Sequence, residues 1–367
     1  MRVLFFIITL IHALIHLLGF IKGFDIKHIK ELTLPVSKTG GTFWLASAIV
    51  LLLFASLFLL DSKHVWSVGI AAALFSQILV FIYWKDARFG TIPNVLILAV
   101  CITGLGAQLM HSAFTDKVKR DFRENNSALS SVLTEDRIKH LPLPVQKYLH
   151  YTKSVGQPLV KNMMAEISGG MRSGPEDGFM PMHSVQYNFF QKPSRYFYMT
   201  AKKAGIPATG LHIYQNATAT FEVKLANWIN VVDAKGEKMD QAETVTILND
   251  MCFMAPATLI DERISWESID PLTVKATFTN GHISITATLY FNEKGELVNF
   301  ISNDRYHTNG KTYLSYPWET PVENYRDMNG YRLPGKAKLI YRKPEGAFVY
   351  GELEITKVSY NLSEVSD

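Results

Sequence analysis

The sequence predicts an α+β protein in which a four-helix transmembrane bundle precedes a curved antiparallel β-sheet wrapped on a plug helix. Two observations predict this fold class. The first third of the 367 residues is almost continuously apolar, and the remainder is polar and mixed in charge. From Met163 onward, apolar residues recur at every second position, which is the period of a half-buried strand. We therefore expect a transmembrane domain at 1–114, a linker at 115–140 and a β-rich soluble domain at 141–367.

Four windows in the first part are long and apolar enough to cross a bilayer, which takes about 20 residues. They are residues 3–21, 42–60, 67–84 and 93–110. The first window is longer than the apolar core of a typical signal peptide, and no A-x-A-like cleavage site follows it. We therefore expect a multi-pass protein of the cell membrane that retains its first helix and contacts membrane lipids.

Charge does not orient this bundle. Six Lys or Arg residues flank the spans on the side of the soluble domain, from Arg2 to Arg123, and six flank them on the other side, from Lys22 to Arg88. The positive-inside rule depends on an imbalance between the two sides. It therefore assigns the soluble domain to neither side of the membrane.

His12 and His16 lie four residues apart in the first window and share one helix face. That spacing suits a metal or a haem, but the second span-embedded His or carboxylate pair that would complete such a site is missing from the sequence. We expect the two imidazoles to form hydrogen bonds inside the bundle, with no metal and no cofactor. Two cysteines do not make a cysteine-rich metal site either.

Alternation and turn residues place the strands of the soluble domain. The run 282–291 alternates cleanly, and Asn280-Gly281 predicts a two-residue hairpin turn before it. Turns are also expected at 293–296 and 327–330. Before the sheet, Pro144 suits the first turn of a short amphipathic helix. The predicted strands are 163–170, 184–191, 195–201, 209–215, 218–224, 274–278, 282–291, 297–303, 332–341 and 350–361.

One helix interrupts the strands, at 240–253. Asp240 is the expected N-cap, and Glu243 three residues later completes an approximate capping box. Val245, Leu248 and Met251 form an apolar stripe that the sheet must bury. Strands such as 187–190 and 196–199 are apolar on both faces. Either the sheet is covered on both sides, or its concave face encloses a hydrophobic ligand.

Several segments resemble an uncharacterised bacterial family of domains of unknown function. They are Leu141-Pro-Leu-Pro-Val-Gln-Lys-Tyr-Leu149, Val231-Val-Asp233, Met239-Asp-Gln-Ala-Glu243, Ile264-Ser-Trp266 and the Tyr325-Arg-Asp-x-x-Gly330 motif. The resemblance spans about 141–361. It implies the lipoprotein-carrier (LolA-like) half-barrel, a curved sheet around a helical plug that holds acyl chains. It implies no catalytic residues.

Established catalytic spacings are missing from the sequence, including G-x-S-x-G, H-E-x-x-H and G-x-G-x-x-G. The most polar cluster runs from Asp304 to His307 and is expected to converge with Tyr325 and Arg326 at a sheet rim. Surface ion pairs explain such charges more readily than catalysis. We therefore expect no enzyme, and the modest net charge of +4, spread along the chain, predicts no nucleic-acid partner.

The sequence thus predicts a membrane-tethered domain that binds a lipid, a lipoprotein or another hydrophobic ligand. The alternative is an assembly module that docks a partner protein and holds no ligand. The expected cavity residues are Phe197, Met199, Val245, Leu248, Met251, Ile285 and Leu289, and the expected polar rim residues are Asp304, Arg305, Tyr306, Tyr325 and Arg326.

Overall fold

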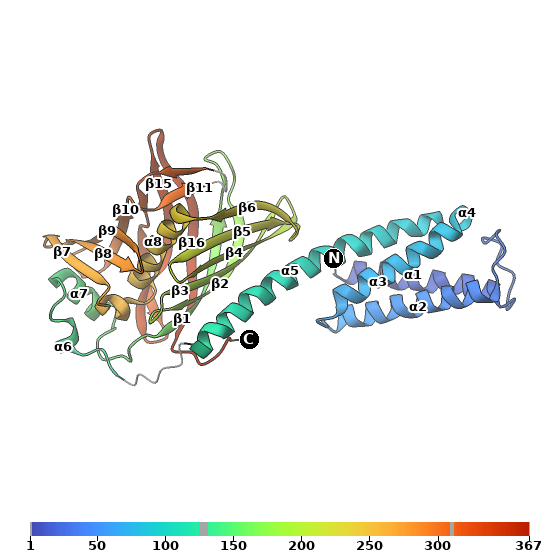
Figure 1. Cartoon of the computed structure of the whole chain (residues 1–367), viewed down its shortest axis with the longest axis horizontal. Coiled ribbons are helices and arrows are strands. Elements are labelled where there is room, and N and C mark those ends of the chain that lie inside the picture. Colours follow the sequence, from blue (N-terminus) through green and yellow to red (C-terminus); the bar gives the residue numbers. More distant parts are fainter. Residues whose placement is uncertain (1, 125–130, 309–311, 367) are drawn as a thin grey trace. The chain divides into compact units, whose positions relative to one another are not determined.

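A computed structural model describes residues 2–124, 131–308 and 312–366. The chain divides into two compact units, Met1–Leu109 and Met110–Asp367. The first unit is helical and the second is mostly β-sheet (Figure 1). The helices of the first unit are α1 (Arg2–Gly23), α2 (Lys38–Leu59), α3 (Val65–Ile82), α4 (Trp84–Ala87), the 3-10 turn η1 (Arg88–Gly90) and α5 (Thr91–Glu124), which continues into the second unit.

Among the described residues, four helical segments are long and apolar enough to cross a membrane. They are Arg2–Gly23, Lys38–Leu59, Val65–Ile82 and Trp84–Glu124. Each contains one of the four windows predicted from the sequence apart from a residue or two at an end. His12 Nε2 lies 2.8 Å from Asn94 Oδ1, and His16 Nε2 lies 2.8 Å from Ser76 Oγ. Both imidazoles are buried and hydrogen-bond to neighbouring helices.

Within the described part of the second unit, fourteen strands form one antiparallel sheet in the order β6-β5-β4-β3-β2-β1-β16-β15-β13-β10-β9-β8-β7, with β14 paired to β15. A separate pair is formed by β11 and β12. The strands are β1 (Asn162–Met171), β2 (Met180–Phe189), β3 (Ser194–Lys203), β4 (Ile206–Gln215), β5 (Thr218–Leu225), β6 (Ile229–Lys235), β7 (Ile264–Asp270), β8 (Thr273–Asn280), β9 (Ile283–Phe291), β10 (Leu297–Ser302), β11 (Tyr306–Thr308), β12 (Tyr313–Ser315), β13 (Trp318–Glu319), β14 (Val322–Met328), β15 (Tyr331–Lys343) and β16 (Gly346–Tyr360).

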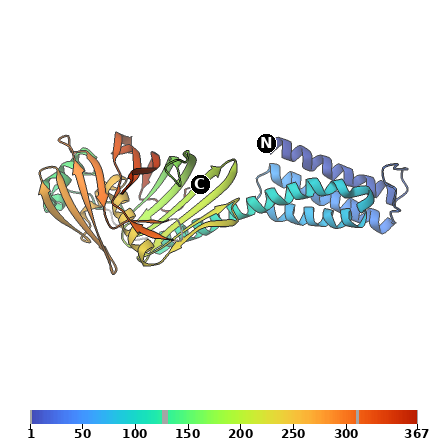
Figure 2. The same cartoon turned by 90° about the horizontal axis from the view of Figure 1, so that it is seen from above.

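The sheet curls around α8 (Glu237–Phe253), which lies inside its curve, and Figure 2 shows strands on both sides of that helix. The stripe of Val245, Leu248 and Met251 is buried in the main core, as predicted. Three short helices complete the described part of this unit: α6 (Glu135–Ile138), α7 (Leu143–Tyr151) and the 3-10 helix η2 (Pro256–Ile260). Tyr148 on α7 donates a hydrogen bond to the Cys252 carbonyl oxygen, 2.7 Å away, and so joins α7 to α8. The α+β half-barrel predicted from the sequence is confirmed.

The start of α8 differs from the prediction. The helix begins at Glu237, after Gly236 at φ 94°, so Asp240 is not its N-cap. Asp240 Oδ1 instead accepts a hydrogen bond from the Ala219 amide of β5, 2.6 Å away, and Glu243 faces Arg195 of β3. The capping box is therefore wrong, because tertiary partners take both carboxylates.

The β8–β9 hairpin also differs from the prediction by one residue. Asn280 pairs with Ile283, so the loop is Gly281-His282. Gly281 has φ +61°, which suits the first central position of a type II′ turn. The predicted turn at 327–330 is confirmed, since Asn329 and Gly330, both at positive φ, join β14 to β15.

The outer face of β1–β4 is covered by the second half of α5. Phe114 and Val118 are buried against Tyr187, Tyr196 and other side chains of these strands. Asp121, also buried, accepts a hydrogen bond from Gln215 Nε2, 3.0 Å away. Residues 115–124, where the predicted linker starts, are thus helical and packed, and 125–130 lie outside the described residues. This cover accounts for one of the two apolar faces noted in the sequence.

Candidate functional site: a cavity beneath α8

The other apolar face lines a cavity of about 580 Å³ between the concave side of the sheet and α8. This volume lies in the range of small-molecule sites, which are mostly apolar with a few placed polar groups. Six methionines line the cavity, and their flexible side chains adapt to varied apolar shapes. They are Met171, Met180, Met182, Met199, Met239 and Met254.

Four neighbouring strands, β2 to β5, form one wall, which we call the β2–β5 panel. Every second residue of β3, from Arg195 to Lys203, lines the cavity. The register pairs these residues with residues of β4, and we call each cross-strand pair a rung. Phe197 lies opposite His212, and Ala201 lies opposite Ala208. Eight residues of strand span about 26 Å. The panel is therefore an elongated apolar surface that begins at a buried arginine and ends at an exposed lysine.

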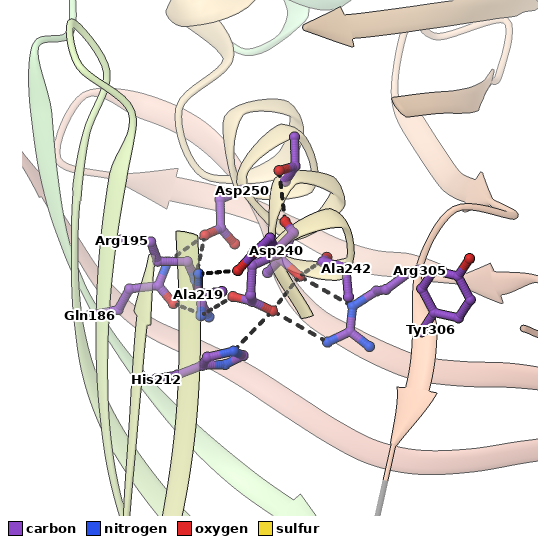
Figure 3. A network of polar contacts seen from close by, with 12 residues as sticks. Gln186, Arg195, His212, Ala219, Asp240, Ala242, Asp250, Arg305 and Tyr306 are labelled. Carbon is purple, nitrogen blue, oxygen red and sulfur yellow. Dashed lines mark hydrogen bonds and ion pairs between the residues drawn. The ribbon is translucent and has the colours of Figure 1, made fainter. Parts of the chain in front are cut away.

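The buried end of the panel holds an ionic network (Figure 3). Arg195 is 7 % exposed. Its Nη1 atom lies 3.1 Å from Glu243 Oε2, and its Nε atom lies 2.9 Å from Asp250 Oδ2. Both carboxylates project from α8. Gln186 and Asn188 of β2 also donate hydrogen bonds to Asp250 Oδ2, at 2.7 and 2.9 Å. The network joins the plug helix to the sheet inside the cavity wall.

Arg305, which precedes β11, reaches Glu243 from the side opposite Arg195 (Figure 3). Its Nη2 lies 3.8 Å from Glu243 Oε1, and its Nε donates to Thr246 Oγ1 at 3.2 Å. Its Nη1 donates to the Tyr341 hydroxyl, and the guanidinium lies 4.5 Å from the centre of the Trp318 ring. Glu243 therefore lies between two guanidinium groups.

Burial shifts two titrations in the network. Desolvation raises the pKa of Asp250 above its usual range, with Arg195 opposing the shift. Desolvation and the charges of Arg195 and Arg305 hold the pKa of His212 well below its usual range. His212 is therefore neutral near pH 7, and Asp250 retains its proton to a higher pH than a solvated aspartate does.

The raised pKa of Asp250 makes stability depend on pH. A folded-state pKa above the unfolded value means that the folded chain binds the proton more tightly, so stability is lost as pH rises above about 4. Asp250→Asn removes this titration and preserves an oxygen acceptor. We expect the melting temperature of Asp250→Asn, relative to that of the natural chain, to rise between pH 4 and pH 7. A constant difference would contradict this prediction.

The structure brings some of the predicted site residues together. Phe197, Met199, Arg305 and Tyr306 line the cavity. The remaining apolar candidates, Val245, Leu248, Met251, Ile285 and Leu289, are buried in the main core and do not line the cavity.

The other rim candidates lie apart from the cavity. Asp304 Oδ2 accepts a hydrogen bond from the Thr286 amide, 2.7 Å away, and the Tyr325 hydroxyl donates to the Leu297 carbonyl oxygen at 2.8 Å. Arg326 lies 3.3 Å from Glu354 on β16. These contacts place the three residues outside the polar network around Glu243.

Sequence reasoning missed Arg195, His212, Glu243 and Asp250 as site residues. A signal existed in α8, because Glu243 and Asp250 are seven residues apart and so share one helix face. Two acids on one face of a helix that the sheet must bury predict a buried partner for them. In β3, Arg195 alternates in phase with the inward-facing Phe197 and Met199.

The chain thus combines an apolar helical unit with a half-barrel that encloses a cavity. The chain belongs to the family of unknown function DUF6544, which matches residues 131–353. A search of curated proteins found no match. Among solved structures, the chain is similar to a LolA superfamily protein from Nitrosomonas europaea, with 10 % identity and a TM-score of 0.34 over 59 % of this chain and 93 % of that one.

Proposed function

We propose that the β-rich unit binds a hydrophobic ligand with a long apolar chain in the cavity beneath α8. The cavity carries this proposal, because its panel of apolar side chains on β2–β5 is not filled by the protein's own core. Leaving so much apolar surface without a partner is unfavourable in a folded protein. A bound acyl chain or a similar hydrocarbon restores those contacts.

The helical unit supplies the setting for this activity. We propose that its four apolar helices cross a membrane, so that the covalent link through α5 restricts the cavity to the neighbourhood of lipids. The ligand is then a membrane lipid or the acyl chain of a lipoprotein. In this proposal the unit receives or holds one such molecule and carries out no chemistry on it.

The proposal is tested on the full chain purified in detergent. Solvent extraction is expected to release a co-purified lipid, and a fluorescent fatty-acid probe is expected to bind saturably to the stripped protein. Ala201→Trp places a large ring in the cavity and is expected to weaken probe binding by at least about tenfold.

Lys202→Trp is the matched control, because Lys202 is exposed and adjacent residues of a strand face opposite sides. It should bind the probe as the natural chain does. A natural chain that yields no lipid and shows no saturable binding would refute the proposal and favour a module that docks a protein. Equal loss in both tryptophan variants would place the probe outside the cavity.

A further inference from the structure

The buried end of the β2–β5 panel is polar, which constrains what can lie there. Arg195, at that end, is 7 % exposed, whereas Lys203, eight residues along the same strand, is exposed. A ligand that ended in a methyl group beside Arg195, Glu243 and Arg305 would remove water from charged groups and return no hydrogen bond. The polar part of the ligand therefore matches this buried end, and its chain matches the apolar rungs.

Arg305 has bonding capacity to spare in this position. A guanidinium carries five N–H donors. The Arg305 group uses Nε on Thr246 and Nη1 on Tyr341, and its Nη2 is 3.8 Å from Glu243 Oε1, beyond a normal hydrogen bond. Its side chain also lines the cavity. An acceptor placed in the cavity can therefore reach a partly unsatisfied cation.

His212 provides a second unsatisfied group that faces the cavity. Its Nε2 atom is buried and makes no hydrogen bond, although it lies 3.2 Å from Glu243 Oε1. The residue is 8 % exposed and lines the cavity in the same rung as Phe197. A buried polar atom without a partner is unusual, and an acceptor on a ligand in the cavity would supply the partner.

The charges of the network point to the sign of that group. Two guanidinium groups, Arg195 and Arg305, share the carboxylates of Glu243 and Asp250. Arg195 contacts both carboxylates closely, whereas the nearest carboxylate oxygen to Arg305 lies 3.8 Å away and the Arg305 side chain lines the cavity. A negative charge on a ligand would therefore pair with the Arg305 guanidinium.

We infer that the ligand carries one anionic head, such as the carboxylate of a free fatty acid, held at the buried end of the β2–β5 panel by Arg305 and His212. This inference rests on the proposed function, adds the polarity and orientation of the ligand, and narrows it to a lipid with an anionic head rather than the methyl-ended acyl chain of a lipoprotein. The head lies beside α8, and the hydrocarbon chain runs along the panel toward Lys203.

The test compares two ligands of equal chain length on the full chain in detergent at pH 8, where a fatty acid is ionised. Palmitate and hexadecan-1-ol compete separately against a bound fluorescent fatty-acid probe. The natural chain is expected to prefer palmitate by about tenfold or more, since a hydrogen bond to a charged group is worth about that factor when buried. Arg305→Gln is expected to remove the preference through a loss of palmitate affinity alone.

Two further variants control for folding. Arg305→Lys keeps the charge and should retain part of the preference, and Arg326→Gln, which lies outside the cavity, should retain all of it. Unchanged affinity of Arg305→Gln for hexadecan-1-ol shows that its cavity is intact. Equal competition by both ligands in the natural chain overturns the anionic head and leaves the proposed function standing. Competition by neither ligand overturns both.

Discussion

Replacing Arg195 with methionine is expected to lower the free energy of unfolding of the β-rich unit by about 3–5 kcal/mol. Methionine preserves most of the side-chain length but removes the positive charge from Glu243 and Asp250, which are 0 % and 5 % exposed. The two acids then stay buried without their nearest cation. Hydrogen exchange of the slowest amides of β1–β5 in the full chain measures the loss.

Lys338→Met is the matched control for this prediction. Lys338 lies 3.7 Å from Glu352, and both side chains are about half exposed, so the change should cost no more than about 1 kcal/mol. Adding Glu243→Gln to Arg195→Met should recover part of the lost stability, because it removes one unpaired buried charge. Additive losses in the double variant would show that the two residues do not form a pair.

The sequence was sufficient for the large-scale architecture because each part of it is encoded locally. An apolar window of about 20 residues defines a membrane-length helix without reference to the rest of the chain. Alternation such as that of residues 282–291 defines a strand in the same way. The edge strand β6, where Trp228, Ile229 and Val231 are exposed in or beside the strand, has no such alternation and was not predicted as a strand.

The ionic network depends on tertiary structure, so local patterns do not reveal it. Its members come from β2 and β3, from α8 and from the segment before β11, and these meet only when the sheet has curled around the helix. Glu243 shows the difficulty. Three residues after Asp240 it satisfies the capping pattern, yet the helix begins earlier and the side chain faces Arg195. Arg305, in contrast, is predicted as a rim residue because its neighbours in the sequence are polar, and it does line the cavity.

The two apolar faces of β3 have separate explanations. From the sequence alone, a covered sheet and a ligand cavity are alternatives. Tyr196 and Tyr198 face outward and pack with residues of α5, whereas Phe197 and Met199 face the cavity. Covering the outer face leaves only the inner face available for a ligand. The same strand therefore links the membrane-length helix to the cavity wall through adjacent side chains.

This arrangement predicts that α5 stabilises the panel. Phe114 is 2 % exposed and stacks on Tyr198, with ring centres 5.6 Å apart. Its ring centre lies 6.0 Å from that of Tyr187. Phe114→Ala is expected to lower the free energy of unfolding of β2–β4 by about 3–5 kcal/mol, through lost burial and an unfilled space. Faster hydrogen exchange in peptides from those three strands measures it.

Arg120→Ala is the matched control on the same helix, because Arg120 is exposed and its replacement should leave exchange within about 0.5 kcal/mol of the natural chain.

The strands in which exchange becomes faster in Phe114→Ala show whether α5 acts on the panel or on the whole sheet. If α5 stabilises the panel, the Phe114→Ala loss is concentrated in β2–β4 and the far strands β7–β9 retain their protection. The same variant should then weaken binding of the fatty-acid probe, because Tyr198 flanks Phe197 and Met199 on β3. Unchanged exchange in β2–β4 would show that the outer face of the sheet is stable without the helix.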